Sequence, residues 1–221
     1  MNAVLAFLRK LKKNNNKPWF DAHRDAYTEV KGEVESFLEG LIRVYGKTDE
    51  SISALTPKEC MFRINRDVRF SKDKSPYKLN FGASITSGGK KSPLAGYYLH
   101  IEPGRSFVGG GIWMPMPADL SRIRQEIDYN LEEFKTIINS SAFKRQYGKL
   151  YTGEDIALQR VPKGYEADNP AAEYLKLKSY LAMKMLTDEE VASPSLQKKC
   201  IAAFTALKPL LEFINRDLVS S

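Results

Sequence analysis

The residues best suited to chemistry lie close together, in the stretch RINRDVRFSKDKSPYK at residues 63–78. Six of its sixteen residues are lysine or arginine and two are aspartate, so it carries a net charge of +4 out of +7 for the whole chain. Clustered guanidinium and ammonium groups bind phosphate or carboxylate through charge-assisted hydrogen bonds. The stretch therefore predicts an anion-binding surface. The alternative is a solvated hairpin whose charges only pair with one another.

The same stretch has the alternation of a β-strand, in which every second side chain lies on the same face. A strand over residues 61–70 places polar residues on one face and directs the apolar ones toward the core. Arg66 falls on the apolar face, so it is either a buried arginine paired with a carboxylate or a residue that a bulge turns outward. The expected polar face comprises Arg63, Asn65, Asp67 and Arg69, and the expected apolar face comprises Phe62, Ile64, Val68 and Phe70.

Two residues of the chain are candidates for acid–base catalysis, Asp67 and His100. A carboxylate between two guanidinium groups stays ionised and fixes their orientation. His100 could act as a general base with Asp67 or Glu102 as its carboxylate partner, although a lone histidine on a sheet is more often structural. The sequence has no GxSxG or HExxH motif and no Cys/His spacing typical of zinc. We therefore expect neither a metal nor a cofactor.

These residues are expected to be positioned by an α+β fold. Apolar residues at helical spacing come first, alternation with a period of two begins near residue 60, and helical spacing returns at residue 118. This order is typical of an antiparallel sheet over about residues 61–114, packed by N- and C-terminal helices in a single domain of residues 1–221. The expected helices are residues 3–13, 18–45, 118–139, 171–178 and 194–218, and the expected strands are 61–70, 78–86, 95–102 and 106–114, with 179–186 as a candidate further strand.

One hairpin of this sheet has a predictable register. Pro103-Gly104 is typical of a type II turn, because proline presets φ at the second position and glycine accepts the positive φ of the third. The strand pairing that follows places His100 opposite Phe107 and Tyr98 opposite Gly109. Three consecutive glycines at 109–111 weaken a strand and call for a reason. The candidates are a bulge, close approach by a ligand or another backbone, and an aromatic ring such as Tyr98 lying over Gly109.

The composition favours a water-soluble protein with anionic partners. Apolar residues make up 43% and charged residues 28% of the 221 residues, and the positive charge favours nucleic acid, phosphorylated metabolites or acidic proteins. There are two cysteines, far apart and in no motif, so we expect a reducing, cytoplasmic environment. The sequence has no run of 18 apolar residues, so we expect no association with a membrane.

Five stretches of the chain occur in the order of a known family: NNNKPWFDAHRDAY, RDVRFSKDKSPYK, GYYLHIEPG, ADLSRIRQEI and VPKGYEADNP. Over roughly residues 3–218 the sequence resembles the bacterial and fungal family called domain of unknown function 2461. His23 stands where that family usually has asparagine, so no role is carried over to it. The resemblance implies a single cytoplasmic domain whose motif residues matter together. The residues carried over by it are Arg66, Asp67, Arg69, Phe70, Asp73, Lys74, Pro76, Tyr77, Lys78, Trp19, Arg24, Gly110, Lys163 and Gly164.

Two classes of function are compatible with these observations. The first is a binding protein, or an enzyme, whose basic pocket holds a small molecule with a phosphate or carboxylate group. The second is a nucleic-acid-binding or protein-interaction module that uses the same basic surface. We favour the pocket, because Phe62, Phe70 and Tyr77 follow the core pattern and are not expected to be exposed for stacking. The expected anion-binding residues are Arg63, Arg66, Arg69, Lys72, Lys74, Tyr77, Lys78 and Lys163, with Tyr98 and His100 as the floor of the pocket.

Overall fold

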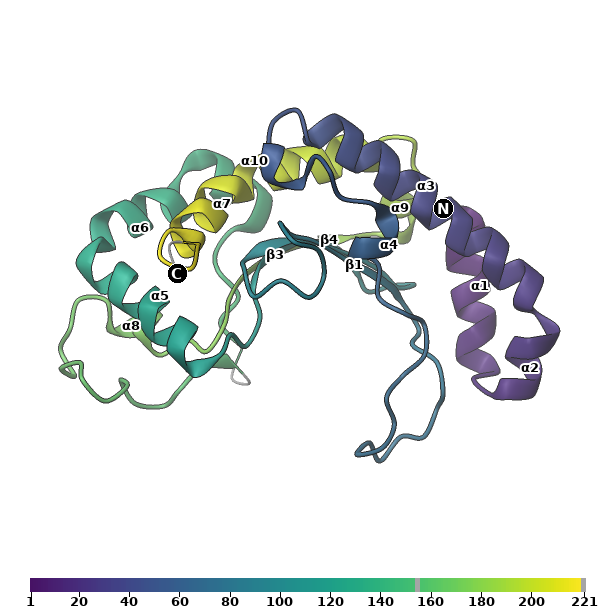
Figure 1. Ribbon diagram of the computed structural model, residues 1–221, viewed down its shortest axis with the longest axis horizontal. Coiled ribbons are helices and arrows are strands. Elements are labelled where there is room, and N and C mark those ends of the chain that lie inside the picture. Colours follow the sequence, from purple (N-terminus) through teal and green to yellow (C-terminus); the bar gives the residue numbers. More distant parts are fainter. Residues whose placement is uncertain (154–155, 220–221) are drawn as a thin grey trace. The chain divides into compact units, whose positions relative to one another are not determined.

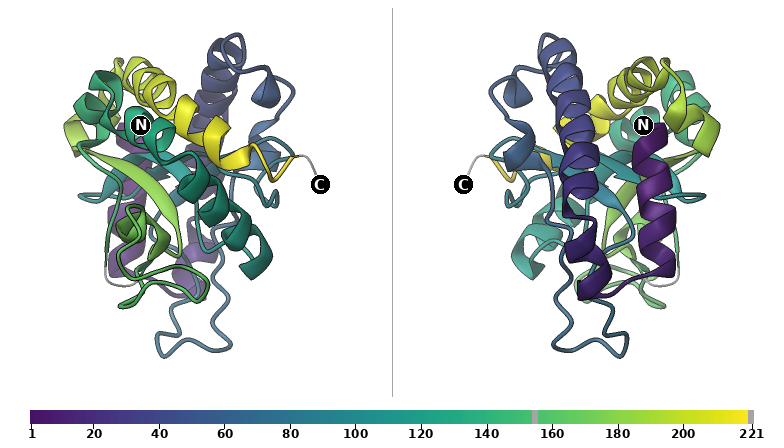
Figure 2. Two further views of the ribbon diagram at one scale, coloured as in Figure 1. Left: turned by 90° about the vertical axis from the view of Figure 1, so that its left-hand side faces the viewer. Right: turned by 90° about the vertical axis from the view of Figure 1, so that its right-hand side faces the viewer.

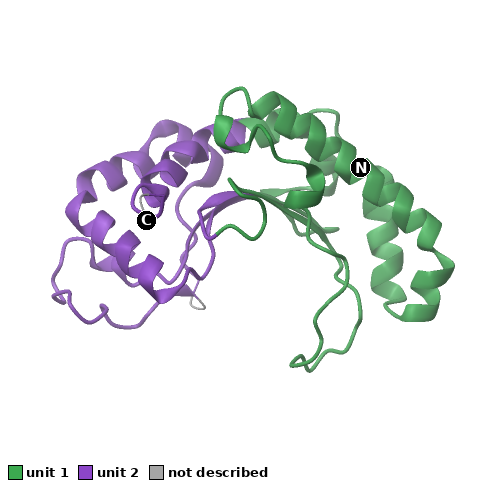
Figure 3. Cartoon of the chain, in the orientation of Figure 1, with its two compact units in different colours: residues 1–92, 98–108, 185–201 green, residues 93–97, 109–184, 202–221 purple. Residues whose placement is uncertain are grey.

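The computed structural model describes residues 1–153 and 156–219 of the chain. These residues form two compact units, drawn in different colours in Figure 3. Unit 1 consists of residues 1–92, 98–108 and 185–201, and the described part of unit 2 consists of residues 93–97, 109–153, 156–184 and 202–219.

A four-stranded antiparallel sheet contributes to both units (Figure 1). Its strands follow the order of the sequence, β1-β2-β3-β4, and the boundaries between the units run through the last three of them. The α+β class and the antiparallel sheet are therefore confirmed, including the candidate strand near the C-terminal end. The strands are β1 (Phe81–Ile85), β2 (Gly96–Ile101), β3 (Ser106–Ile112) and β4 (Tyr180–Leu186).

The hairpin of β2 and β3 has the predicted turn and register. Gly104 has a φ of 75°, and the Arg105 amide donates to the Glu102 carbonyl at 2.9 Å, which closes the turn. The rings of His100 and Phe107 stack with 4.8 Å between their centroids, as expected for residues that face each other across the hairpin.

The glycine run of β3 is explained by a neighbouring backbone. A Cβ atom added at Gly109 or Gly111 would collide with the main chain of β4, at the carbonyls of Ala182 and Tyr180 respectively. Of the three alternatives, close approach of another backbone is the one found, and Tyr98 is not among the atoms nearest to a Cβ at Gly109. The Tyr98 hydroxyl instead lies where a Cβ atom of Gly82 would be, so the ring crosses toward β1.

The helices of unit 1 begin with α1, whose buried apolar stripe packs against α3. The helix expected over 18–45 is interrupted at His23, which has φ −118° and ψ 24°. There the imidazole stacks on the Trp19 ring and its Nδ1 lies 2.8 Å from the Trp19 carbonyl oxygen. A side chain that bonds to a main-chain carbonyl in this way competes with the hydrogen bonds by which the helix would continue. The elements are α1 (Asn2–Lys13), α2 (Lys17–Ala22), α3 (Arg24–Tyr45), η1 (Glu50–Ile52), α4 (Pro57–Cys60) and α9 (Asp188–Ala192).

Unit 2 contains the remaining helices. The helix expected over 118–139 breaks at Asn130, whose side chain donates to the Glu126 carboxylate one turn earlier. An asparagine that bonds back in this way favours a helix end. Residues 202–215 of α10 complete the unit, and Tyr97 packs on Phe204 of that helix at 4.5 Å between centroids. The elements are α5 (Pro117–Tyr129), α6 (Leu131–Asn139), α7 (Ser141–Tyr147), α8 (Ala172–Leu175) and α10 (Leu196–Asn215), the first six residues of which belong to unit 1.

The predicted strand over residues 61–70 is wrong. Residues 62–80 form a long extended loop, here called the basic arm. Its outgoing and returning sides pair at one antiparallel bridge, between Asn65 and Tyr77. Figures 1 and 2 show it projecting away from α3 and α4. Backbone pairing ends at the hydrogen bond from the Arg66 amide to the Pro76 carbonyl. Proline has no amide to donate, and the cations beyond this point gain more from water than from a sheet.

Candidate functional site

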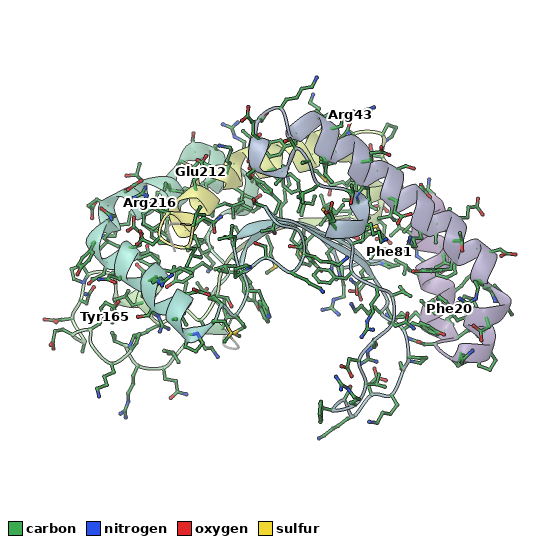
Figure 4. All side chains as sticks on the ribbon, viewed as in Figure 1. Phe20, Arg43, Phe81, Tyr165, Glu212 and Arg216 are labelled. Carbon is green, nitrogen blue, oxygen red and sulfur yellow. The ribbon has the colours of Figure 1, made fainter. Side chains whose placement is uncertain are left out.

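The basic arm is anchored to the helices through Tyr77, which is buried. The Asn15 side chain donates to the Tyr77 carbonyl at 2.9 Å and accepts from the Tyr77 amide at 3.1 Å. The Tyr77 ring stacks on Phe20 of α2, with 3.9 Å between centroids (Phe20 is labelled in Figure 4). Tyr77, predicted to contact a ligand, therefore lies in the anchor of the arm.

Arg66 braces the two sides of the arm against each other. Its guanidinium pairs with Asp73 and donates to the Ser75 carbonyl at 3.0 Å and to the Ser71 hydroxyl at 3.3 Å. The pairing with a carboxylate that the sequence allowed is found, but Arg66 lies in a loop and its side chain is 25% exposed rather than buried. Hydrogen bonds from the Ser75 hydroxyl and amide, together with Arg66, lower the pKa of Asp73 to about 2.

A second ion pair lies at the tip of the arm. Arg69 donates from Nε to Asp67 Oδ1 at 2.9 Å and from Nη2 to Asp67 Oδ2 at 2.6 Å. This two-pronged geometry fixes the guanidinium plane. The bonds from the Arg69 side chain and amide, with a smaller contribution from Arg63, hold the pKa of Asp67 below its usual value. Asp67 thus orients one arginine, as expected, although it does so in a loop rather than on a strand.

These pairings use both aspartates of the arm and leave several cations uncompensated. Lys74 donates to the Val68 carbonyl at 2.9 Å. Within residues 1–153 and 156–219, no carboxylate lies within ion-pair distance of Arg63, Lys72 or Lys78. Lys78 lies across the arm from the residue next to Arg63, because its amide donates to the Ile64 carbonyl at 2.7 Å. Burial and, after it, the positive charge of Arg63 lower the pKa of Lys78.

A row of rings on the sheet leads away from Lys78. The Lys78 ammonium lies 5.4 Å from the centroid of Phe62, a ring that is 38% exposed. Phe62 lies 6.4 Å from Tyr98, and Tyr98 lies 5.6 Å from Phe107. Burial raises the pKa of the Tyr98 hydroxyl, which keeps it protonated and able to donate. The row therefore offers apolar ring surface with a cation at one end.

His100 closes the other end of the row, and its orientation is fixed. Its Nε2 lies 2.9 Å from the Glu102 carboxylate, and its Nδ1 lies 3.4 Å from the Asn80 amide nitrogen. The carboxylate can only accept, so Nε2 carries the proton, and Nδ1 accepts the long, weak bond from Asn80. Glu102, rather than Asp67, is therefore the carboxylate partner of this histidine.

The structure divides the predicted residues into separate groups. Lys78, at the base of the arm, contacts Phe62, and the rings continue from Phe62 to Tyr98 and His100. These residues, with Arg63 on the opposite side of the arm from Lys78, are the candidate site. Lys163 lies exposed in unit 2. Among the described residues, no cluster of three His, Cys, Asp or Glu side chains could hold a metal ion. Tyr77 lies in the anchor of the arm. The other predicted residues lie toward its tip: Arg66, Asp67, Arg69, Lys72 and Lys74.

Two rings of the site, Phe62 and Phe107, were not expected there from the sequence. Phe62 was expected in the core because it lies on the apolar side of an alternating pattern. Phe107 could have been found, because the register of the hairpin places it against His100. Phe70, also expected in the core, is 97% exposed.

Comparisons with known proteins agree with the motifs. Residues 3–213 match the family described as conserved hypothetical protein (DUF2461), and the chain belongs to this family. No curated protein matches the sequence, and no solved structure matches it either. None of the helices formed by the described residues has the length and apolar character needed to span a membrane.

Proposed function

We propose that unit 1 binds a small molecule that carries both a phosphate or carboxylate group and a flat ring. Arg63 and Lys78 hold the anionic group, and Phe62 and Tyr98 contact the ring. The observation that carries the proposal is the pair of cations at the base of the arm. The Lys78 amide donates to the Ile64 carbonyl at 2.7 Å, which brings Lys78 opposite the neighbour of Arg63. The Lys78 ammonium lies beside the half-exposed ring of Phe62, while Asp67 and Asp73 pair with Arg69 and Arg66.

Electrostatics supports an anion at this place. Two like charges held together on a partly buried surface destabilise each other, and an anion between them removes that cost. Binding is therefore expected to raise the pKa of Lys78 back toward the ordinary value for lysine. This rise can be followed through the NMR signal of the carbon next to the Lys78 ammonium.

The neighbouring rings support a ligand with a flat apolar part. Aromatic rings pair favourably at centroid distances of about 4.5–7 Å, in stacked or edge-on geometry. The Tyr98 hydroxyl remains a donor, and His100 Nδ1 has only the weak bond from Asn80, so both can bond to polar atoms of a ligand. In this proposal Asp67 and His100 position their neighbours rather than transfer protons. The cytoplasm is the compartment we propose, because the only two cysteines are both buried.

Calorimetric titration with phenyl phosphate and with inorganic phosphate tests the proposal. Phenyl phosphate should bind more tightly, because only it reaches the rings. Lys78→Met and Arg63→Gln should each weaken it about 10- to 100-fold, as for the loss of one charge-assisted hydrogen bond. Lys72→Met, an equal loss of charge at the tip of the same arm, is the matched control and should change little. Equal effects of all three variants, or no binding of phenyl phosphate, would contradict the proposal.

A further inference from the structure

The tip of the basic arm has a feature that the anion site does not use. Phe70 is 97% exposed, the most exposed of the large apolar side chains in the described residues. The Arg69 guanidinium lies over its ring at 5.8 Å from the centroid. A phenyl ring in water is unfavourable by roughly 1.5–3 kcal/mol relative to a buried one, so its exposure is expected to serve a contact.

The tip holds Phe70 outward in a fixed loop. Arg69 is fixed by its two bonds to Asp67, Lys74 bonds across the tip to the Val68 carbonyl, and Arg66 bonds to Asp73. The bonds of Lys74 and Arg66 join the two sides of the loop, and the Arg69–Asp67 pair fixes the residues directly before Phe70. Much of the entropy of ordering the loop is therefore lost on folding and not on binding.

We propose that the tip of the basic arm binds single-stranded nucleic acid. A base stacks on the face of Phe70 that Arg69 leaves open, and the lysines Lys72 and Lys74 contact the flanking phosphates. Every base has a π-face, so the contact is tolerant of sequence, and stacking on an aromatic ring is a common way to bind single strands. This inference is independent of the proposed small-molecule site, because its residues are different ones.

The geometry favours a single strand over a duplex or a membrane. In a duplex the faces of the bases are stacked on one another and are not available to an exposed ring. Insertion of Phe70 into a bilayer would carry the neighbouring Arg69–Asp67 pair into the interface, and desolvating charges is costly. Stacking on one base covers only the ring, so that the ion pair stays in water.

Fluorescence anisotropy with a labelled thymidine 12-mer tests this proposal on the full chain. Phe70→Ala should weaken binding about 5- to 150-fold, the ratio that corresponds to the loss of one base–aromatic stack. Because Phe70 is almost fully exposed, the variant should fold normally, and Phe70→Trp should restore or exceed the original affinity. Tyr129→Ala is the matched control, since Tyr129 is 73% exposed but lies in unit 2, and it should leave the affinity unchanged.

The salt dependence gives a second readout. Each phosphate contact on a single strand contributes about −0.7 to the slope of log K against log salt concentration, so Lys72→Met and Lys74→Met should each reduce the slope by about that amount. Lys78→Met should affect the oligonucleotide little, and Phe70→Ala should leave phenyl phosphate binding unchanged, which separates this proposal from the first.

Three results would overturn the inference. They are unchanged oligonucleotide affinity in Phe70→Ala, equal affinity for the 12-mer and for its duplex with adenosine 12-mer, and Phe70-dependent binding to phosphatidylserine vesicles without binding to the 12-mer.

Discussion

The basic arm and the β2–β3 hairpin are both pairs of extended segments joined by a turn, yet different forces hold them. In the hairpin, backbone hydrogen bonds and buried side chains such as Leu99 and Val108 stabilise the pairing. In the arm, backbone pairing reaches only as far as Arg66. Beyond it, the Arg66–Asp73 ion pair and the bond from Lys74 to the Val68 carbonyl connect the two sides. Burial specifies the conformation of the hairpin, whereas charge specifies that of the arm beyond Arg66.

This difference has consequences for binding. A segment held by burial cannot expose its side chains without losing its structure. A segment held by its own ion pairs can present an apolar ring and uncompensated cations to a partner while remaining ordered. The arm should therefore respond to changes of charge and pH that leave the hairpin unaffected, and the hairpin should respond to changes of volume.

The largest loss of stability is expected from Gly111→Ala in the hairpin. Gly111 has a φ of 123°, and a Cβ atom there would collide with the Tyr180 main chain. Backbone strain and overpacking each cost about 1–3 kcal/mol, so the free energy of unfolding should fall by about 3 kcal/mol or more. Denaturant titration measures it.

Gly32→Ala in α3 is the control for this change. Its new methyl group would meet no atom within 4 Å, and Gly32 has no positive φ. The substitution should stabilise the protein by about 0.5–1 kcal/mol through helix propensity. If Gly111→Ala lost no more stability than a surface variant does, close packing would not be what specifies the hairpin.

A smaller and more local effect is expected from Arg66→Gln. The change removes the ion pair to Asp73 and weakens the bonds that join the two sides of the arm, which should cost about 1 kcal/mol locally. Hydrogen exchange should accelerate at the backbone amides of residue 66 and Lys78, which pair across the arm. Exchange at the Val108 amide in the hairpin should not change. Arg105→Gln, at an exposed arginine 3.8 Å from Glu102, is the control. Equal acceleration in arm and hairpin would mean that the arm is not a separate structural unit.

The smallest effect on the structure of the arm is expected from a fall in pH. The pKa of Asp73 is lowered to about 2 in the folded chain, so its stabilising contribution is complete above the unfolded value near 3.8 and is lost as pH falls through about 2. NMR signals of the arm should shift progressively between about pH 4 and pH 2, before those of Val108. In Asp73→Asn the change of these NMR signals with pH should be smaller, because only the titration of Asp67 remains in the arm. An arm that titrates together with the hairpin would contradict the idea that charge holds the arm beyond its anchored base.

Much of the fold could be predicted because its signals are local. The apolar stripes of α1 and α10 have helical period, and the turn at Pro103-Gly104 sets a register that brings His100 to Phe107. The interruptions at His23 and Asn130 were missed, since periodicity continues across both. They depend on where a side chain bonds to its own helix, and residue type alone leaves this open.

By itself, the sequence determined the order of elements, the concentration of charge in residues 63–78 and the candidate carboxylates for His100. Only the tertiary structure decided that residues 62–80 leave the sheet, that Asp67 and Asp73 engage Arg69 and Arg66, and that Phe70 faces water. The physical reason is that alternation specifies which side chains share a face. Whether that face is covered depends on a second element being present to cover it, and for the tip of this arm no such element lies in the described chain.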